Sequence, residues 1–287
     1  MKRTLNKVLS LPPIRFVADM LDVYFSKRVG RAAAELAYFL VLTFFPILIC
    51  ISAFIGQLNL DLSMLTLLNE AGEFLPSGVV AIFRDYLYYI DTNLSTPMFL
   101  SGAFLAILFA SAAVRGLMNI MHEIYGRATF LGIRQVIASV LFSILLIATI
   151  YLSMAVVVTG NWFFHILGKV LKLENLVERF GAWQWKKYLL LLAMVFLFIL
   201  LLYRFAAPLD KPRPPVVPGA LAAAIALAIA SLIFSVLMSG STRYSLIYGS
   251  LASVIIMLVW LYLCGNILIL GNAVNYVIYK HRKEPHA

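Results

Sequence analysis

The chain has 287 residues, of which 63% are hydrophobic and only 13% are charged, and its mean hydropathy is +0.95. Soluble proteins carry roughly a quarter of charged residues, so this composition excludes an ordinary soluble domain and indicates an integral membrane protein. The net charge of +10 does not favour a nucleic-acid partner. Most lysines and arginines fall on one side of the expected helices, where they orient the chain and contact anionic headgroups.

Residues 1–31 are basic, and the apolar residues between Ile14 and Phe25 recur every three or four positions. This spacing predicts an amphipathic helix that lies on the cytoplasmic face of the membrane. The basic start is not followed by a short apolar core with a small-residue cleavage site. No cleaved signal peptide is therefore expected.

The first transmembrane helix is expected at about residues 32–56. No charge occurs between Glu35 and Asp61, and that stretch is longer than the roughly 20 apolar residues that cross a bilayer. Basic residues stand directly before this helix and acidic residues follow it, so the positive-inside rule places the amino terminus in the cytoplasm. Pro46 lies near the middle of the span, where it predicts a hinge or a fixed kink, and the kink is the simpler interpretation.

Five further apolar stretches complete a set of six spans, at about residues 97–120, 136–160, 187–207, 218–238 and 250–279. The fifth is so rich in Ala and Gly that a buried helix is favoured over one that faces lipid. Between the spans, residues 62–90 and 161–185 hold apolar residues at helical spacing, which predicts extra interfacial helices on the outer side. The predicted fold is all-α: one polytopic membrane domain with both termini in the cytoplasm.

Ionisable residues inside spans are the first functional candidates, because a charge in lipid is costly. Glu35 in the first span and Arg115 in the second are expected near the cytoplasmic ends of their helices, at similar depth. An ion pair or hydrogen bond that joins the two spans is favoured over a role in moving substrate.

Other polar residues offer weaker signals. Arg243 and Tyr248, in the turn before the last span, either receive an anionic headgroup through the planar donors of the arginine or anchor the turn at the interface. Asn266, Asn272 and Asn275 in the last span either line a polar path or bond neighbouring helices, and the second interpretation is slightly favoured.

Enzyme signatures are absent from the sequence. The four histidines have no ligand spacing, and there is no Walker loop, no G-x-S-x-G motif and no pair of carboxylates on one helix face. The two cysteines fall in expected spans and predict no disulfide framework. We therefore expect no catalytic residues, no metal and no cofactor.

An ordered set of short motifs spread over about residues 20–280 resembles the YihY/BrkB family of bacterial inner-membrane proteins. The motifs are Ala33–Phe39, Phe45–Pro46, Met118–Asn119, Ile124–Tyr125, Leu202–Arg204, Pro208, Pro218–Ala220, Tyr248–Leu251, Trp260–Tyr262 and Gly271–Asn275. The last motif departs from the family, which usually has Ala-Glu where this chain has Asn272 and Ala273. If transport or proton coupling in other members depends on that glutamate, the resemblance does not imply the same mechanism for this chain.

The resemblance implies a multi-pass envelope protein of the bacterial cytoplasmic membrane. Members are named in places as virulence or serum-resistance factors, and some are linked to export of lipid A precursors or other lipids. The ribonuclease label that some members carry has no support here, because nothing resembles a nuclease centre. We expect a protein that transports or accommodates a lipid or other amphipathic molecule, with membrane lipids, anionic ones among them, as partners and no nucleic acid. The alternatives are a non-transporting envelope scaffold or assembly factor and a small-solute channel.

Overall fold

The computed structural model describes residues 12–57, 96–126, 133–171, 183–207, 213–239 and 251–283, and every regular element within these ranges is an α-helix. The helices are α2 (Pro12–Ser26), α3 (Val29–Gln57), α6 (Thr96–Ile124), α7 (Ile133–Leu171), α9 (Trp183–Ala206), α10 (Val217–Ser239) and α12 (Leu251–Lys283). The six helices from α3 to α12 are long and apolar enough to cross a membrane. The predicted all-α fold with six spans is therefore confirmed.

The third spanning helix is longer than the expected span. Helix α7 continues to Leu171, beyond residue 160, because the apolar residues of the following segment keep their helical spacing and no proline interrupts them. The rest of that segment, from 172 to 182, and the expected outer helices at 62–90 lie outside the described residues.

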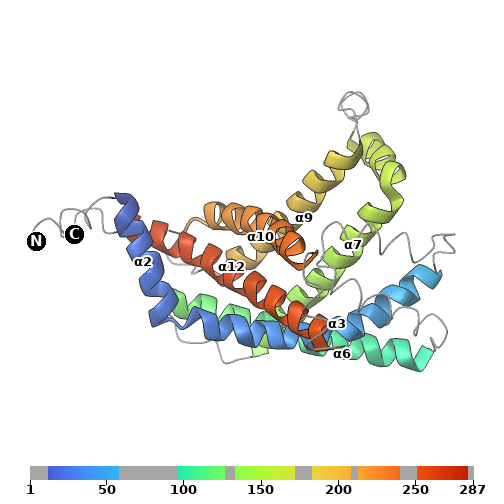
Figure 1. The fold of residues 1–287 in the computed structure, drawn as a ribbon, viewed down its shortest axis with the longest axis horizontal. Coiled ribbons are helices and arrows are strands. Elements are labelled where there is room, and N and C mark those ends of the chain that lie inside the picture. The colour runs from blue at the N-terminus through green and yellow to red at the C-terminus, as the bar shows by residue number, and fades with distance from the viewer. Residues whose placement is uncertain are drawn as a thin grey trace, which may run out of the picture.

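The six spanning helices form a closed ring. Each packs against the next one along the chain, in the order α3, α6, α7, α9, α10 and α12, and α12 closes the ring by packing against α3. Further contacts of α6 with α9 and with α12 cross the ring. In Figure 1, α12 (red) runs beside α3 (blue) although the two lie at opposite ends of the sequence.

Helix α10 is buried along one face only, which corrects the expectation of a buried fifth span. Its Ala220, Ala223 and Ala224 are buried, whereas its large side chains, such as Leu221 and Ile233, are exposed. Small residues on the packed face allow close approach to α12, and the branched residues on the other face suit lipid.

Helix α2 runs across the end of the ring in Figure 1 and packs against α12 and α3. Its Val23 is buried, whereas Val17, Leu21 and Phe25 on the apolar stripe are exposed, so the helix has the amphipathic pattern that the sequence predicted. Lys27 and Arg28 form the turn into α3, and Arg28 has a φ of 51°, which is uncommon for a residue other than glycine.

Pro46 lies inside α3 and is buried. In Figure 1 the two halves of the α3 ribbon run in different directions, as expected where proline removes a backbone hydrogen bond. The hinge role of Pro46 stays a prediction.

Candidate functional site

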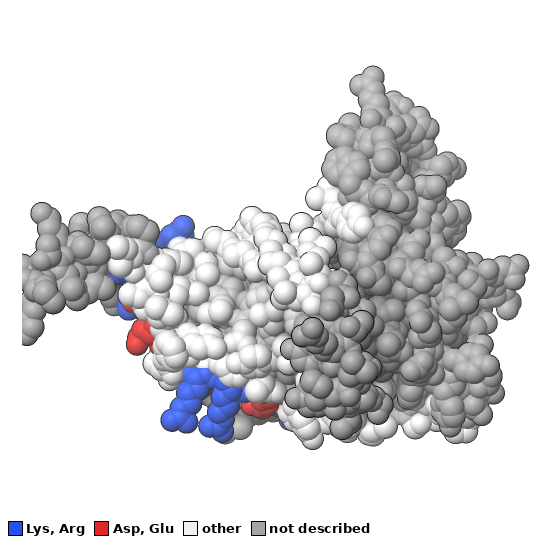
Figure 2. Space-filling model, in the orientation of Figure 1, with Lys and Arg blue, Asp and Glu red and all other residues white. Residues whose placement is uncertain are grey.

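One end of the ring collects the basic side chains. The spans alternate in direction, so the first turns of α3, α7 and α10 and the last turns of α6, α9 and α12 share this end, which we call the basic end. The Lys and Arg residues with described side chains lie at or near it: Arg15, Lys27, Arg28, Arg31, Arg115, Arg134, Arg204, Arg213, Lys280, Arg282 and Lys283. In Figure 2 the blue atoms gather near α2, and most of the described surface of the spans is uncharged.

A pocket of about 500 Å³ lies at the basic end, between the α2–α3 turn and the last turns of α6. Its lining combines cationic, anionic and neutral polar side chains, which come from Ser26, Lys27, Arg28, Arg31, Ala32, Glu35, Gly116, Asn119, Ile120 and Glu123. We call it the elbow pocket. In Figure 2 blue and red atoms lie close together along the lower edge of the described surface.

Gly116 makes room for the carboxylate of Glu35. A Cβ atom at position 116 would lie 3.3 Å from Oε1 of Glu35 and 3.6 Å from its carboxyl carbon, so the glycine lets the side chain lie against α6. Glu35 is almost two turns from the start of α3, whereas Glu123 is in the last turn of α6. The two carboxylates therefore line different depths of the elbow pocket.

Asn119 on the pocket wall is oriented by the next helix. Its Oδ1 accepts a hydrogen bond from the side-chain amide of Gln135 in α7, and Gln135 is buried. With that oxygen engaged, the amide N–H groups of Asn119 are the part of the side chain left to bind a ligand.

The five charged side chains of the elbow pocket do not neutralise one another. The ion pairs found in the described part of the chain join none of Lys27, Arg28, Arg31, Glu35 and Glu123. These groups are consequently available to a ligand of matching charge.

The expected pair of Glu35 and Arg115 is not formed: among the described residues no ion pair or hydrogen bond joins them. The reason is helix geometry, because successive residues point about 100° apart around a helix axis. Gly116 faces Glu35, and the neighbouring Arg115 is exposed and absent from the pocket lining.

The three asparagines of α12 have different surroundings. Asn275 bonds the start of α10, where its Oδ1 accepts from the Gly219 N–H at 2.7 Å and its Nδ2 donates to the Val216 carbonyl at 3.2 Å. Asn266 donates to the carbonyl of Tyr262 in its own helix. Asn272 is fully buried, and its side-chain amide has no hydrogen-bond partner among the described residues.

Two other predicted contacts, Arg243 and Tyr248, lie outside the described residues.

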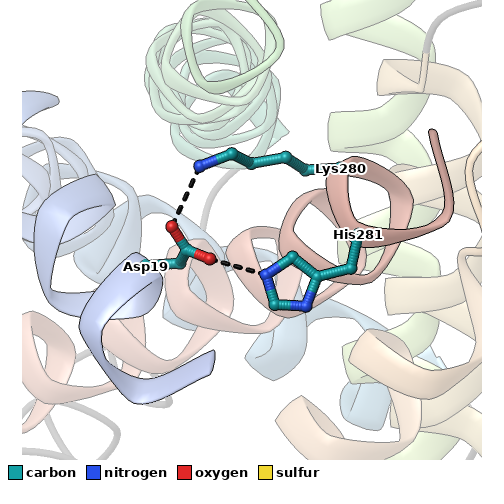
Figure 3. Close-up of polar contacts among 3 residues, drawn as sticks. All are labelled: Asp19, Lys280 and His281. Carbon is teal, nitrogen blue, oxygen red and sulfur yellow. Dashed lines mark hydrogen bonds and ion pairs between the residues drawn. The ribbon is translucent and has the colours of Figure 1, made fainter. Parts of the chain in front are cut away.

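An ion-pair cluster that the sequence did not suggest joins α2 to the end of α12 (Figure 3). Asp19 accepts hydrogen bonds from Lys280 Nζ at 2.9 Å and shares one with His281 Nε2 at 2.6 Å. Partial burial raises the pKa of Asp19, but the hydrogen bonds and charges of Lys280 and His281 outweigh that effect, so the pKa lies below its ordinary value. The cluster fixes α2 across the basic end.

The elbow pocket was not predicted from the sequence either. In the sequence, Lys27, Arg28 and Arg31 indicate only the orientation of the first span, Asn119 belongs to a family motif, and Glu123 carries no functional signal. Nothing in their spacing signals a pocket, because it forms only where the α2–α3 turn meets α6. Among the described residues, no three His, Cys, Asp or Glu side chains are grouped as a metal site would require.

Comparisons with known proteins agree with the resemblance. The family model described as "Virulence factor BrkB" matches residues 20–287. The chain is 26% identical over 274 residues to the ribonuclease-like protein YfkH of Bacillus subtilis (strain 168). The aligned region covers 94% of this chain and 97% of that protein. No solved structure matches the chain.

Proposed function

The chain belongs to the virulence factor BrkB family, and from that premise we propose that it binds a phosphate-bearing lipid in the elbow pocket and moves it between the leaflets of the bacterial cytoplasmic membrane. In this proposal the basic end faces the cytoplasm, as the positive-inside rule requires. The observation that carries the proposal is the group of three cations that line one pocket and form no ion pair with a carboxylate of the described residues.

Arg28 and Arg31 suit a phosphate because a guanidinium presents planar, paired donors to its oxygens. Lys27 adds a point charge, and the amide of Asn119 adds a neutral donor. These groups favour an anionic oxygen cluster over a neutral solute.

Helix α2 supports placing the pocket at headgroup depth. Its exposed Val17, Leu21 and Phe25 suit the boundary between headgroups and acyl chains, where amphipathic helices lie. The elbow pocket begins at the turn that follows this helix, so a headgroup reaches it from the membrane surface.

The proposed route follows the contact between α3 and α6. Next to Ile49 of α3, α6 presents Gly102, where an added Cβ would lie 3.1 Å from the isoleucine side chain. Buried Ala106 and Ala113 continue this face toward the elbow pocket. Small residues let the two helices pack closely, so the proposed route requires this contact to open while lipid moves.

A scramblase assay tests the proposal. Purified protein in liposomes that contain a fluorescent phospholipid is treated with a membrane-impermeant quencher, which reveals exchange between leaflets. We expect exchange with the native chain and a rate lower by about tenfold or more with Arg28→Gln plus Arg31→Gln, since each lost charge-assisted hydrogen bond is worth about 1.5–3 kcal/mol. The matched control is Arg134→Gln plus Arg204→Gln, two exposed basic-end residues outside the pocket.

Exchange no faster than in protein-free liposomes would exclude lipid movement by the isolated chain. Lipid bound specifically in the elbow pocket without exchange would instead favour the non-transporting scaffold.

A further inference from the structure

The elbow pocket contains two carboxylates that phosphate binding does not explain. Glu35 and Glu123 share the lining with Lys27, Arg28 and Arg31, and a phosphate alone would be repelled by both carboxylates. The mixture of charges therefore points to a ligand that carries a positive group as well as a negative one.

The carboxylate of Glu35 in particular requires a positively charged or polar partner. It lies within the first candidate span, where an ionised carboxylate is costly unless it faces a polar cavity or a counterion. Neither Arg31, one turn earlier on the same helix, nor Arg115 forms an ion pair with it in the described structure. Gly116 leaves the space into which the carboxylate extends.

We propose that the elbow pocket recognises headgroups in which a phosphate diester is joined to a primary ammonium, as in an aminophospholipid; this inference rests on the proposed function. Arg28 and Arg31 bind the phosphate oxygens, and Glu35 and Glu123 accept hydrogen bonds from the ammonium. Two carboxylates at different depths allow the ammonium to keep a partner as the headgroup moves along the pocket.

The spacing of the groups fits this chemistry. Arg31 and Glu35 are four residues apart on α3, so their Cβ atoms lie about 5–6 Å apart on one face of the helix. An ethanolamine headgroup separates its phosphate from its ammonium by two carbon atoms, which suits this arrangement of cation and carboxylate. A glycerol headgroup offers only hydroxyl groups at the corresponding position.

Lipid binding to the full chain, measured by native mass spectrometry, tests the inference. The probes are phosphatidylethanolamine and phosphatidylglycerol with identical acyl chains. We expect the native chain to bind the ethanolamine lipid about tenfold more tightly, a difference of about 1.4 kcal/mol. Glu35→Gln plus Glu123→Gln should abolish this preference, because it removes the acceptors of the ammonium and relieves the repulsion of the phosphate in both lipids. Arg31→Gln should weaken the binding of both lipids.

Two further variants distinguish a specific loss of the lipid preference from a general loss of structure. Asp22→Asn removes an exposed carboxylate of α2 outside the pocket and should keep the preference. Gly116→Ala keeps every charge but places a Cβ 3.3 Å from the Glu35 carboxylate, so it should reduce the preference for the ethanolamine lipid.

Soluble competitors distinguish a lipid from a free phosphorylated amine. Displacement of the lipid by glycerophosphoethanolamine but not by glycerophosphoglycerol would support recognition of the headgroup, and tighter binding of the soluble compound than of the lipid would identify it as the ligand. Equal binding of the two lipids by the native chain, or a preference that survives in the double glutamine variant, would overturn the inference. Binding of neither lipid would instead reject the proposed function.

Discussion

The side chain of Asn275 in α12 holds the first turn of α10, through a 2.7 Å hydrogen bond from the Gly219 N–H and a 3.2 Å hydrogen bond to the Val216 carbonyl. The first N–H groups of a helix have no partner within it, and lipid supplies none. One asparagine therefore satisfies a donor and an acceptor at the start of another spanning helix.

Replacing this side chain should destabilise the ring. Asn275→Ala leaves the Gly219 N–H unpaired, whereas the Val216 carbonyl keeps its hydrogen bond from the Ala220 N–H at 3.1 Å. We expect a loss of about 1–3 kcal/mol in the free energy of unfolding. The matched control is Asn266→Ala, which removes a bond to the carbonyl of its own helix and should cost less. Thermal unfolding in detergent micelles compares the variants, and equal losses would contradict the capping role.

A methyl group at Gly219 should be poorly tolerated. Its Cβ would lie 2.6 Å from the side-chain amide carbon of Asn275 and would overlap the backbone oxygen of Gly271, and backbone cannot move aside easily. We expect Gly219→Ala to cost about 3 kcal/mol or more. The atoms nearest to an added Cβ at Gly102 belong to the side chain of Ile49, at 3.1 Å, so Gly102→Ala should cost clearly less in the same unfolding measurement. The reverse order would show that α10 and α12 do not pack as described.

The link from Asp19 to α12 should depend on pH. The folded-state pKa of Asp19 is below its ordinary value of 3.8, so its contribution is fully present above about pH 4 and is lost as pH falls through the lowered pKa. The side chains of Lys280 and His281 are 35% and 30% exposed, which limits the contribution to about 0–1 kcal/mol.

Asp19→Asn should therefore lower the unfolding temperature at neutral pH and have little effect in acid. Asp22→Asn, which changes an exposed carboxylate on the same helix, serves as the control. A difference between native chain and Asp19→Asn that grows as pH falls would contradict the assignment.

A hydroxyl pair joins α6 to α7. The Oγ atoms of Ser111 and Ser139 lie 2.9 Å apart in a buried hydrogen bond. A double-mutant cycle with Ser111→Ala and Ser139→Ala should give a coupling of about 0.6 kcal/mol, typical of polar pairs between membrane helices. Additive effects of the two changes would show that the hydroxyl groups do not support each other.

The amino-acid sequence by itself determined the six spans, the amphipathic character of α2 and the family. Each of these depends on local order: the length of apolar runs, the spacing of Val17, Leu21 and Phe25, and short motifs in a fixed sequence. The apolar helices of the structure and the family match over residues 20–287 bear this out.

Only the tertiary structure decided which side chains meet. Hydropathy fixes the depth of Glu35 but not the rotation of α3 about its axis, and that rotation places the carboxylate against Gly116 and not beside Arg115. The pairing of Asp19 with Lys280, 261 residues away, requires the ring to close between the first and last spans. The rotation of α3 and the closure of the ring follow from packing between segments that are distant in the sequence. No local pattern in the sequence encodes this packing.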